Sequence, residues 1–206
     1  MKNPTLISLI RHGQVHNPGR LFYGRMPGYG LSNTGYNEAK QAARFLSKKP
    51  LTALFSSPLL RSRQTANEIA TFHGSLKIKI SRLLNEVNSA FEGQPMRKIE
   101  SQYGEVYASD NPKFDQPYDV FNRSCRFIAK ILRHYAGQHV AAVTHGDIIA
   151  YTLIGFSDLP INAESKTRLK RLGISDAYPA TGSVTTLSYS AGSFSKNPAI
   201  YYSRPV

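Results

Sequence analysis

Histidine and arginine side chains follow several short apolar runs of this sequence. Arg11 and His12 come directly after the run 6–10, and His145 follows the run 140–144. A neutral imidazole nitrogen is a competent nucleophile at pH 7, and a guanidinium offers forked donors that match phosphoryl oxygens. The combination indicates chemistry on an anionic ester, in which phosphoryl transfer depends on positioning and charge stabilisation.

A further arginine lies where a cation is not expected. Ser57 followed by Pro58 predicts an N-cap with proline in the first turn of a helix, and this places Arg61 in that turn. The helix dipole disfavours a cation there by about 0.3–1 kcal/mol, whereas backbone N–H groups at the same end attract an anion. Arg61 therefore indicates an anion site. The pair His73-Gly74 is expected in an ordinary turn, so a His-Gly pair alone carries little weight.

The elements that must position these residues follow from periodicity. Short apolar runs alternate with amphipathic stretches, which predicts an α/β fold: a three-layer sandwich with a mainly parallel central sheet flanked by helices. In such sheets ligands bind outside the carboxyl ends of the strands, so His12, Arg61 and His145 are expected on one edge. We expect strands at 6–10, 51–55, 76–80, 140–144, 184–190 and 199–202, the last two antiparallel, and helices at 33–46, 58–72 and 147–154.

One further helix is predicted by a stripe of apolar residues at helical spacing, formed by Phe121, Cys125, Ile128, Leu132 and Tyr135. We expect this stripe to be core, with Cys125 buried and unreactive.

Composition bounds the whole chain. The 206 residues, 41% hydrophobic, predict one catalytic domain spanning 1–206. No apolar run approaches the roughly 20 residues of a bilayer span, and the N-terminus resembles a signal peptide only faintly. A single cysteine excludes an intramolecular disulfide and a thiolate metal cluster, and we expect a cytoplasmic protein.

The chain is strongly basic, with a formal net charge of +13. A basic surface concentrates anions of any kind, whether phosphorylated metabolites or nucleic acid. Charge alone does not choose between them. A basic nucleic-acid-binding or phosphoprotein-binding module without turnover is therefore one alternative, which the complete set of candidate catalytic residues disfavours.

At these residues the sequence resembles the histidine phosphatase superfamily, also called the phosphoglycerate mutase-like family. The resemblance covers nearly the whole chain in the expected order. It is carried by Arg11-His12-Gly13, by 31–35 (LSNTG), by 56–61 (SSPLLR) with 64–66 (QTA), by 84–86 (LNE) with 91–93 (FEG), and by 143–146 (VTHG).

The resemblance implies a fold, a chemistry and site residues. His12 would be phosphorylated during turnover, with Arg11, Arg61 and His145 around the transferred phosphoryl group. Glu86 would be the proton donor, a role that asks for a raised pKa; burial near Leu83, Leu84 and Val87 would raise it and the arginines would lower it, so the sign stays open.

Other contacts and alternatives complete the expectation. Asn17 is expected to contact phosphate, and His145 adds a donor if protonated; Tyr23 and Gly24 belong to a loop, 20–25, that is expected to shape the substrate pocket with the segment 105–118. We expect a phosphatase for a small phosphorylated metabolite, with a phosphomutase as the first alternative. No metal or cofactor is expected, because the histidines show no ligand spacing. A homodimer is left open, and substrate identity is beyond the sequence.

Overall fold

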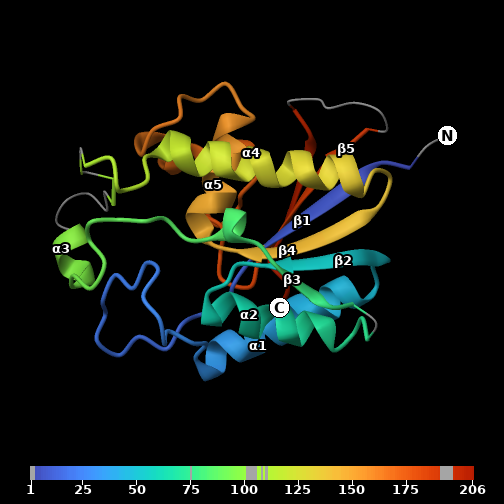
Figure 1. Ribbon diagram of the computed structural model, residues 1–206, viewed down its shortest axis with the longest axis horizontal. Helices are drawn as coiled ribbons and strands as arrows, with labels where there is room; N and C mark the ends of the chain where they lie inside the picture. Colours follow the sequence, from blue (N-terminus) through green and yellow to red (C-terminus); the bar gives the residue numbers. More distant parts are fainter. Residues whose placement is uncertain (1–2, 75, 101–105, 108, 110, 191–196) are drawn as a thin grey trace.

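The computed structural model describes residues 3–74, 76–100, 106–107, 109, 111–190 and 197–206, which form a six-stranded sheet between helices (Figure 1). The strand order is β3-β2-β4-β1-β5-β6. β1 to β4 are mutually parallel, whereas β5 is antiparallel to both β1 and β6. The strands are β1 (Thr5–Arg11), β2 (Leu51–Ser56), β3 (Ile78–Ile80), β4 (His139–Thr144), β5 (Val184–Tyr189) and β6 (Ala199–Ser203).

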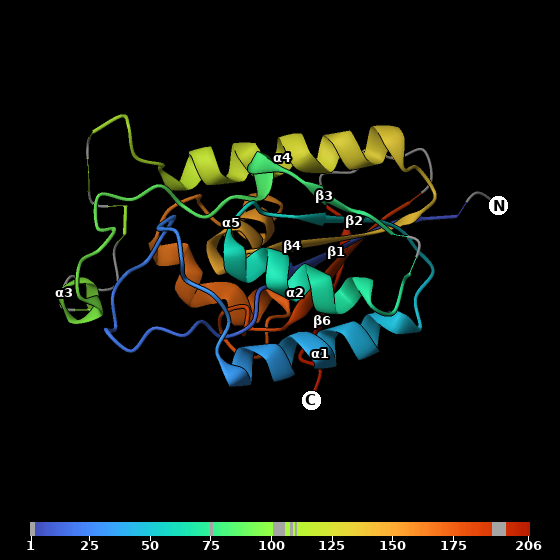
Figure 2. The same ribbon diagram turned by 60° about the horizontal axis from the view of Figure 1, so that its bottom comes forward.

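Helices cover both faces of the sheet and confirm the three-layer α/β prediction (Figure 2). The described helices are α1 (Asn33–Ser47), α2 (Leu60–Ala70), α3 (Met96–Glu100), α4 (Pro117–His134) and α5 (Gly146–Gly155), with 3-10 turns η1 (Arg82–Leu84) and η2 (Glu164–Leu172). α1 and α2 pack on one face, and α4 and α5 pack on the other.

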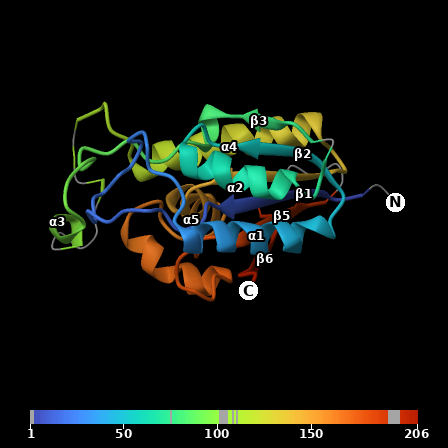
Figure 3. The same ribbon diagram turned by 90° about the horizontal axis from the view of Figure 1, so that it is seen from below.

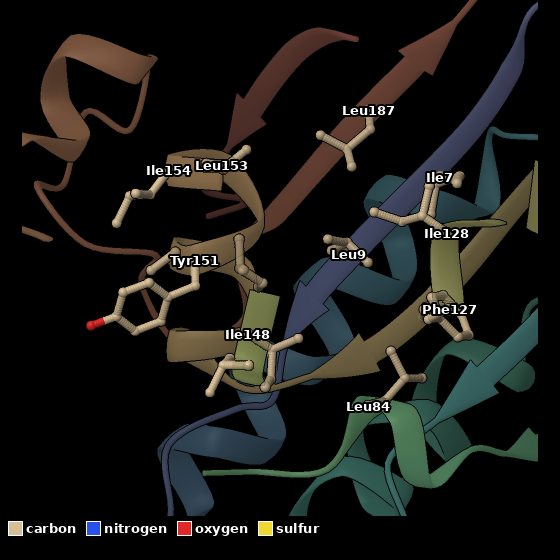
Figure 4. Close-up of a cluster of buried hydrophobic side chains, with 14 of the residues drawn as sticks. Ile7, Leu9, Leu84, Phe127, Ile128, Ile148, Tyr151, Leu153, Ile154 and Leu187 are labelled. Atoms are coloured by element: carbon tan, nitrogen blue, oxygen red, sulfur yellow. The ribbon is translucent and has the colours of Figure 1, made fainter. Parts of the chain in front are cut away.

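The strands are apolar on both faces because each face meets a helical layer. In β1, Ile7 and Leu9 point toward α4 and α5, whereas Ile10 points toward α1 and α2. Figure 4 shows the buried cluster on the side of α4 and α5, in which Phe127 of α4 and Ile148 of α5 lie together with Ile7 and Leu9 of β1. Burial on both sides explains why the strands read as near-continuous apolar runs rather than alternating ones.

The carboxyl ends of the central parallel strands meet at one edge of the sheet. Arg11 pairs with Thr144, and Ser56 pairs with Val143. The segment 17–30 and α3 lie beyond this edge (Figure 3), and an isolated bridge joins Leu21 to Pro95. The predicted convergence of the three strand-end segments is therefore present in the fold.

The start of α2 differs from the prediction. Its N-cap is Leu59, which makes no side-chain capping bond, so Ser57 is not the cap; the helix also ends at Ala70 rather than at Phe72. The Ser57 hydroxyl instead lies 2.8 Å from Nε2 of His145. A polar side chain before a helix has a capping signature, but here a buried tertiary partner competes for the same oxygen. The cap of α1 is as expected: Ser32 accepts a bond from the Gly35 N–H.

The apolar stripe of α4 is displaced by one residue from the predicted one. The residues buried along it are Val120, Ser124, Phe127, Ile128 and Ile131. Of the predicted stripe Ile128 is buried, and Phe121, Leu132 and Tyr135 are only partly buried. Cys125 is half-buried rather than buried, and desolvation raises the pKa of its thiol, which favours the unreactive protonated form. Among the described residues, none of the helices has the length and apolar character of a membrane span.

Candidate active site

His12 directly follows β1 and is buried, with 1% of its surface exposed. Its Nδ1 lies 2.8 Å from the Gly13 carbonyl, which can only accept, and Nε of Arg61 donates to its Nε2 at 3.1 Å. Both contacts require the same tautomer, with the proton on Nδ1 and a lone pair on Nε2. Burial, and then the charge of Arg61, hold the pKa of His12 well below its usual value. The side chain is thus a neutral imidazole with a nucleophilic nitrogen.

Two glycines allow the backbone after His12 to lie against the first turn of α1. A Cβ on Gly13 would sit 2.2 Å from the Gly35 carbonyl oxygen, and a Cβ on Gly35 would sit 1.9 Å from that of Gln14. Thr65 of α2 accepts a bond from the Gly13 N–H at 3.1 Å. The loop that carries His12 is therefore fixed between α1 and α2.

Arg61 lies in the first turn of α2, as predicted, and is completely buried. Its Nη2 donates to the Gly24 carbonyl at 2.8 Å, and its guanidinium lies over the Tyr23 ring, 4.7 Å from the centroid. Within the described part of the chain, its buried Nη1 has no hydrogen-bond partner. A buried guanidinium with an unused donor is suited to an anion.

His145, the residue before α5, lies beside His12 with 5.1 Å between the ring centroids. Nη2 of Arg61 is 3.3 Å from its Nδ1, and an arginine can only donate, so Nδ1 accepts and Nε2 donates to Ser57. Burial, and then Arg61, hold the pKa of His145 well below its usual value. The side chain is neutral here, and the charged donor considered from the sequence is not its state in this site.

Glu86 places its carboxyl group against both of these side chains. Its Oε2 lies 3.3 Å from Nδ1 of His145 and 3.7 Å from Nη2 of Arg61. Burial raises the pKa of Glu86, although Arg61 opposes the rise. The direction of the Glu86 pKa shift, which the sequence left open, is therefore upward, because the desolvation of the carboxylate outweighs the effect of the nearby guanidinium.

Arg11, the last residue of β1, is half-buried. Its Nη1 donates to the Pro179 carbonyl at 2.7 Å, and its guanidinium lies 5.2 Å from the centroid of Tyr178. Among the described residues, its buried Nε has no partner. Arg11 and Arg61 thus each offer a donor to the same edge of the sheet.

A cavity of about 440 Å³ opens beside this cluster. Asn17, Tyr23 and Gly24, which the sequence predicts to contact phosphate or substrate, line this cavity. The Asn17 amide, however, bonds twice to the backbone of Leu21, through Nδ2 at 2.9 Å and Oδ1 at 3.1 Å, so here it closes the loop. Of the expected segment 105–118, Val106 lines the cavity, and residues 105, 108 and 110 lie outside the described residues.

One wall of the cavity was not predicted. Asp147 accepts short bonds from Tyr178 and Tyr107, both at 2.5 Å, and lies 3.5 Å from Nζ of Lys166. Asp147 directly follows the His145-Gly146 pair, and this adjacency is the one signal that would have found it. Lys166 and Tyr178 come from segments distant in sequence, with no motif to mark them, whereas Tyr107 belongs to the segment 105–118 that was expected to shape the pocket.

The family model of the histidine phosphatase superfamily (branch 1) matches residues 7–192. The chain belongs to this superfamily. The match contains every residue of the cluster, from Arg11 to His145, and it confirms the resemblance inferred from the motifs.

Relatives within the histidine phosphatase superfamily are moderately similar to this chain in sequence. An uncharacterized protein of Mycobacterium tuberculosis, Rv0525, is 32% identical over 70% of this chain and 75% of its own length. The fructose-2,6-bisphosphatase TIGAR of Xenopus laevis is 34% identical over 66% of this chain but only 51% of its own. The solved structure of mycobacterial glucosyl-3-phosphoglycerate phosphatase Rv2419c superposes with a TM-score of 0.76 at 21% identity, covering 98% of both chains, and so shares the fold.

The three titratable side chains of this histidine phosphatase site also meet the geometric condition for a cation site. Ligand atoms of His12, Glu86 and His145 lie within 4.8 Å of one another. The sequence showed no such ligand spacing, because His12 and His145 follow two different strands and Glu86 lies in the segment after η1. The buried Arg61 guanidinium contacts all three residues, however, and a cation would have to enter against its charge. The arrangement fits an anion better than a metal ion.

Proposed function

We propose that this protein is a metal-independent phosphatase that hydrolyses a small phosphorylated metabolite through a phosphohistidine on His12. One observation carries the proposal: Nε2 of His12 is a buried lone pair facing Arg61, and Glu86 and His145 lie in the same cluster. Family membership and the phosphatase names of relatives such as TIGAR support it.

In the proposed first step the phosphoryl group transfers to the enzyme. The lone pair on Nε2 of His12 forms the N–P bond while the ester P–O bond breaks. The leaving oxygen takes the proton of Glu86, whose raised pKa favours the protonated carboxyl group. Arg11 and Arg61 neutralise charge on the equatorial oxygens, donors of a kind worth roughly 2.7–4 kcal/mol each in preorganised sites.

In the proposed second step water hydrolyses the phosphohistidine. Glu86, now a carboxylate, takes a proton from water, and the resulting hydroxide forms a new P–O bond as the N–P bond breaks. The electron pair returns to Nε2, and phosphate leaves. Acid and base roles thus alternate on one carboxyl group.

Substrate binding requires the donor of Arg61 to leave His12. The contact between Nε of Arg61 and Nε2 of His12 occupies the lone pair that must attack phosphorus. A phosphoryl group offers the guanidinium stronger, charge-assisted acceptors. We infer that Arg61 turns from the imidazole to the phosphoryl oxygens as substrate enters.

A phosphate-release screen tests the proposal. It would include p-nitrophenyl phosphate, sugar phosphates, phosphoserine, phosphoglycerate, nucleotides and α-ribazole phosphate. We expect release from at least one of them, unchanged by EDTA, and at least a 10³-fold loss in His12→Asn, because asparagine cannot form the phosphohistidine. Phosphate release that persists in His12→Asn, or no release from any compound, would contradict the proposal. If no compound is hydrolysed and the protein binds DNA with a steep salt dependence, the binding-module alternative would be favoured.

The phosphomutase alternative uses the same residues and differs in whether water reaches the phosphohistidine. Incubation with 3-phosphoglycerate, with and without 2,3-bisphosphoglycerate, separates the two. Isomerisation without phosphate release would favour the mutase.

A further inference from the structure

The segment that carries Glu86 has no regular secondary structure of its own. η1 ends at Leu84, and residues 85–89 form neither helix nor strand. On the inner side, Thr144 donates to the Leu84 carbonyl at 2.8 Å, and the side chain of Asn85 accepts from the Glu86 N–H at 3.2 Å. The first contact holds the segment to β4 and the second lies within the segment, and both leave the Asn85 and Glu86 carbonyls to other donors.

Two arginines from distant parts of the chain bind those carbonyls from the outer side. Arg25 donates through Nε to the Glu86 carbonyl at 2.7 Å. Arg123 of α4 donates through Nη1 to the Asn85 carbonyl and through Nη2 to the Glu86 carbonyl at 3.5 Å. The backbone on both sides of the Glu86 nitrogen is therefore held by guanidinium groups.

Asp115 joins the two arginines. Its Oδ2 accepts from Nη2 of Arg25 at 2.8 Å, from Nη2 of Arg123 at 2.9 Å and from the Asn88 N–H at 3.0 Å. The three side chains are 15–30% exposed, so they are shielded from solvent more than a surface ion pair. One carboxylate oxygen thus lies between two guanidiniums that would otherwise repel each other, and it offsets half of their combined positive charge.

The loop that carries Arg25 also contacts Arg61, on the side of the site where the phosphoryl group would bind. Gly24, the neighbour of Arg25, accepts from Arg61 through its carbonyl. The cluster is therefore tied both to the segment of the proposed proton donor and to the loop that holds Arg61.

We propose that Arg25, Asp115 and Arg123 form a positioning clamp that holds the Glu86 carboxyl where it can protonate the leaving oxygen. The clamp makes no contact with the reacting atoms; it acts through the Asn85–Glu86 backbone. The inference rests on the proposed role of Glu86. Positioning matters at this level because a displacement of about 1 Å can reduce a rate by about 10²-fold.

Leaving-group dependence tests the clamp. An alkyl phosphate needs protonation of its leaving oxygen, whereas p-nitrophenyl phosphate leaves as a stable anion. We expect Asp115→Asn and Arg123→Gln to lower kcat/KM at least about tenfold for the best alkyl phosphate of the screen, and less than about threefold for p-nitrophenyl phosphate. kcat/KM is the right quantity because it excludes the later hydrolysis of phosphohistidine.

Two further measurements separate positioning from loss of fold. Arg126→Gln, an exposed arginine of the same helix, is the matched control and should change neither substrate's kcat/KM. In the double variant Glu86→Gln/Asp115→Asn, the effect of Asp115→Asn on the alkyl phosphate should vanish, because the proposed action of the clamp on the leaving oxygen runs through the Glu86 carboxyl. Equal losses for both substrates, additive effects, or no loss in either clamp variant would each overturn the inference. Absence of His12-dependent activity in the wild type would instead overturn the proposed function.

Discussion

The sharpest chemical consequence at the scale of single residues concerns the proton on Glu86. Burial raises the pKa of this carboxyl above its ordinary value, so the protonated acid persists to higher pH than in a peptide. The proposed first step needs that proton. Its rate should therefore fall as the pH rises through the raised pKa of Glu86.

Glu86→Gln should lower kcat/KM for an alkyl phosphate by about 10²–10⁴-fold and abolish the alkaline fall of its pH profile, because glutamine neither donates an acidic proton nor titrates. pH–rate profiles of both proteins check this. A variant that keeps the wild-type alkaline limb would show that another group titrates there.

Asp147 affects the pKa of the same carboxyl group. Its negative charge is among the causes that raise the pKa of Glu86. Asp147→Asn removes the charge, so the pKa of Glu86 should fall and the alkaline limb of kcat/KM should move to lower pH. Asp158→Asn, an exposed carboxylate beyond α5, is the control. A limb that stays in place, or moves to higher pH, would contradict this electrostatic role.

Element packing sets where His12 lies, because its loop runs against the first turn of α1. The contact has no room for a side chain: a Cβ on Gly35 would meet backbone, which cannot move aside as a flexible side chain can. Whether position 35 tolerates a side chain therefore depends on how the His12 loop packs against α1, and not on Gly35 alone.

Gly35→Ala should lower stability by at least about 1–3 kcal/mol, the usual effect of overpacking, and reduce phosphate release by displacing the His12 loop. Gly74→Ala is the matched control, since nothing lies within 4 Å of its added Cβ. Thermal melts and activity of both variants check the prediction. Equal melting temperatures for the two would show that the α1 turn yields to the extra methyl group.

At the scale of the whole molecule, buried neutral histidines make stability depend on pH. His139 begins β4 at the opposite end of the sheet from the site, and its Nε2 lies 2.9 Å from the Ser8 hydroxyl. Burial lowers its pKa from 6.5 to about 4. The unfolded chain therefore binds a proton between pH 6.5 and 4 that the folded protein excludes.

The sign follows from that difference. Stability contributed by neutral His139 is present above pH 6.5 and is lost as the pH falls toward 4, where the folded state also becomes protonated. Melting temperatures should decline over this range, and the decline should be shallower in His139→Asn than in the wild type. His134→Asn, an exposed histidine of α4, should leave the slope unchanged. Parallel slopes in all three proteins would rule out His139 as a source, although His12 and His145, whose pKa values are also lowered, contribute in the same direction.

Periodicity and strand order were enough to predict the three layers of the fold and the edge of the sheet where the candidate site lies. Strands buried on both faces read as continuous apolar runs, and parallel strands bring their carboxyl ends together, so His12, Arg61 and His145 were expected on one edge. The family was also readable, because its motifs are local in sequence and keep their order.

Contacts between distant segments could be read only from the folded structure. Four features depend on residues tens of positions apart in the sequence. They are the partner of Ser57, the side of α4 that faces the core, the cavity wall around Asp147 and the Arg25–Asp115–Arg123 cluster. The pKa of Glu86 was undecidable from sequence for the same reason: burial and Arg61 push it in opposite directions, and their balance depends on packing. Residue types and strand order carry local information, whereas desolvation and distance arise only when the chain has folded.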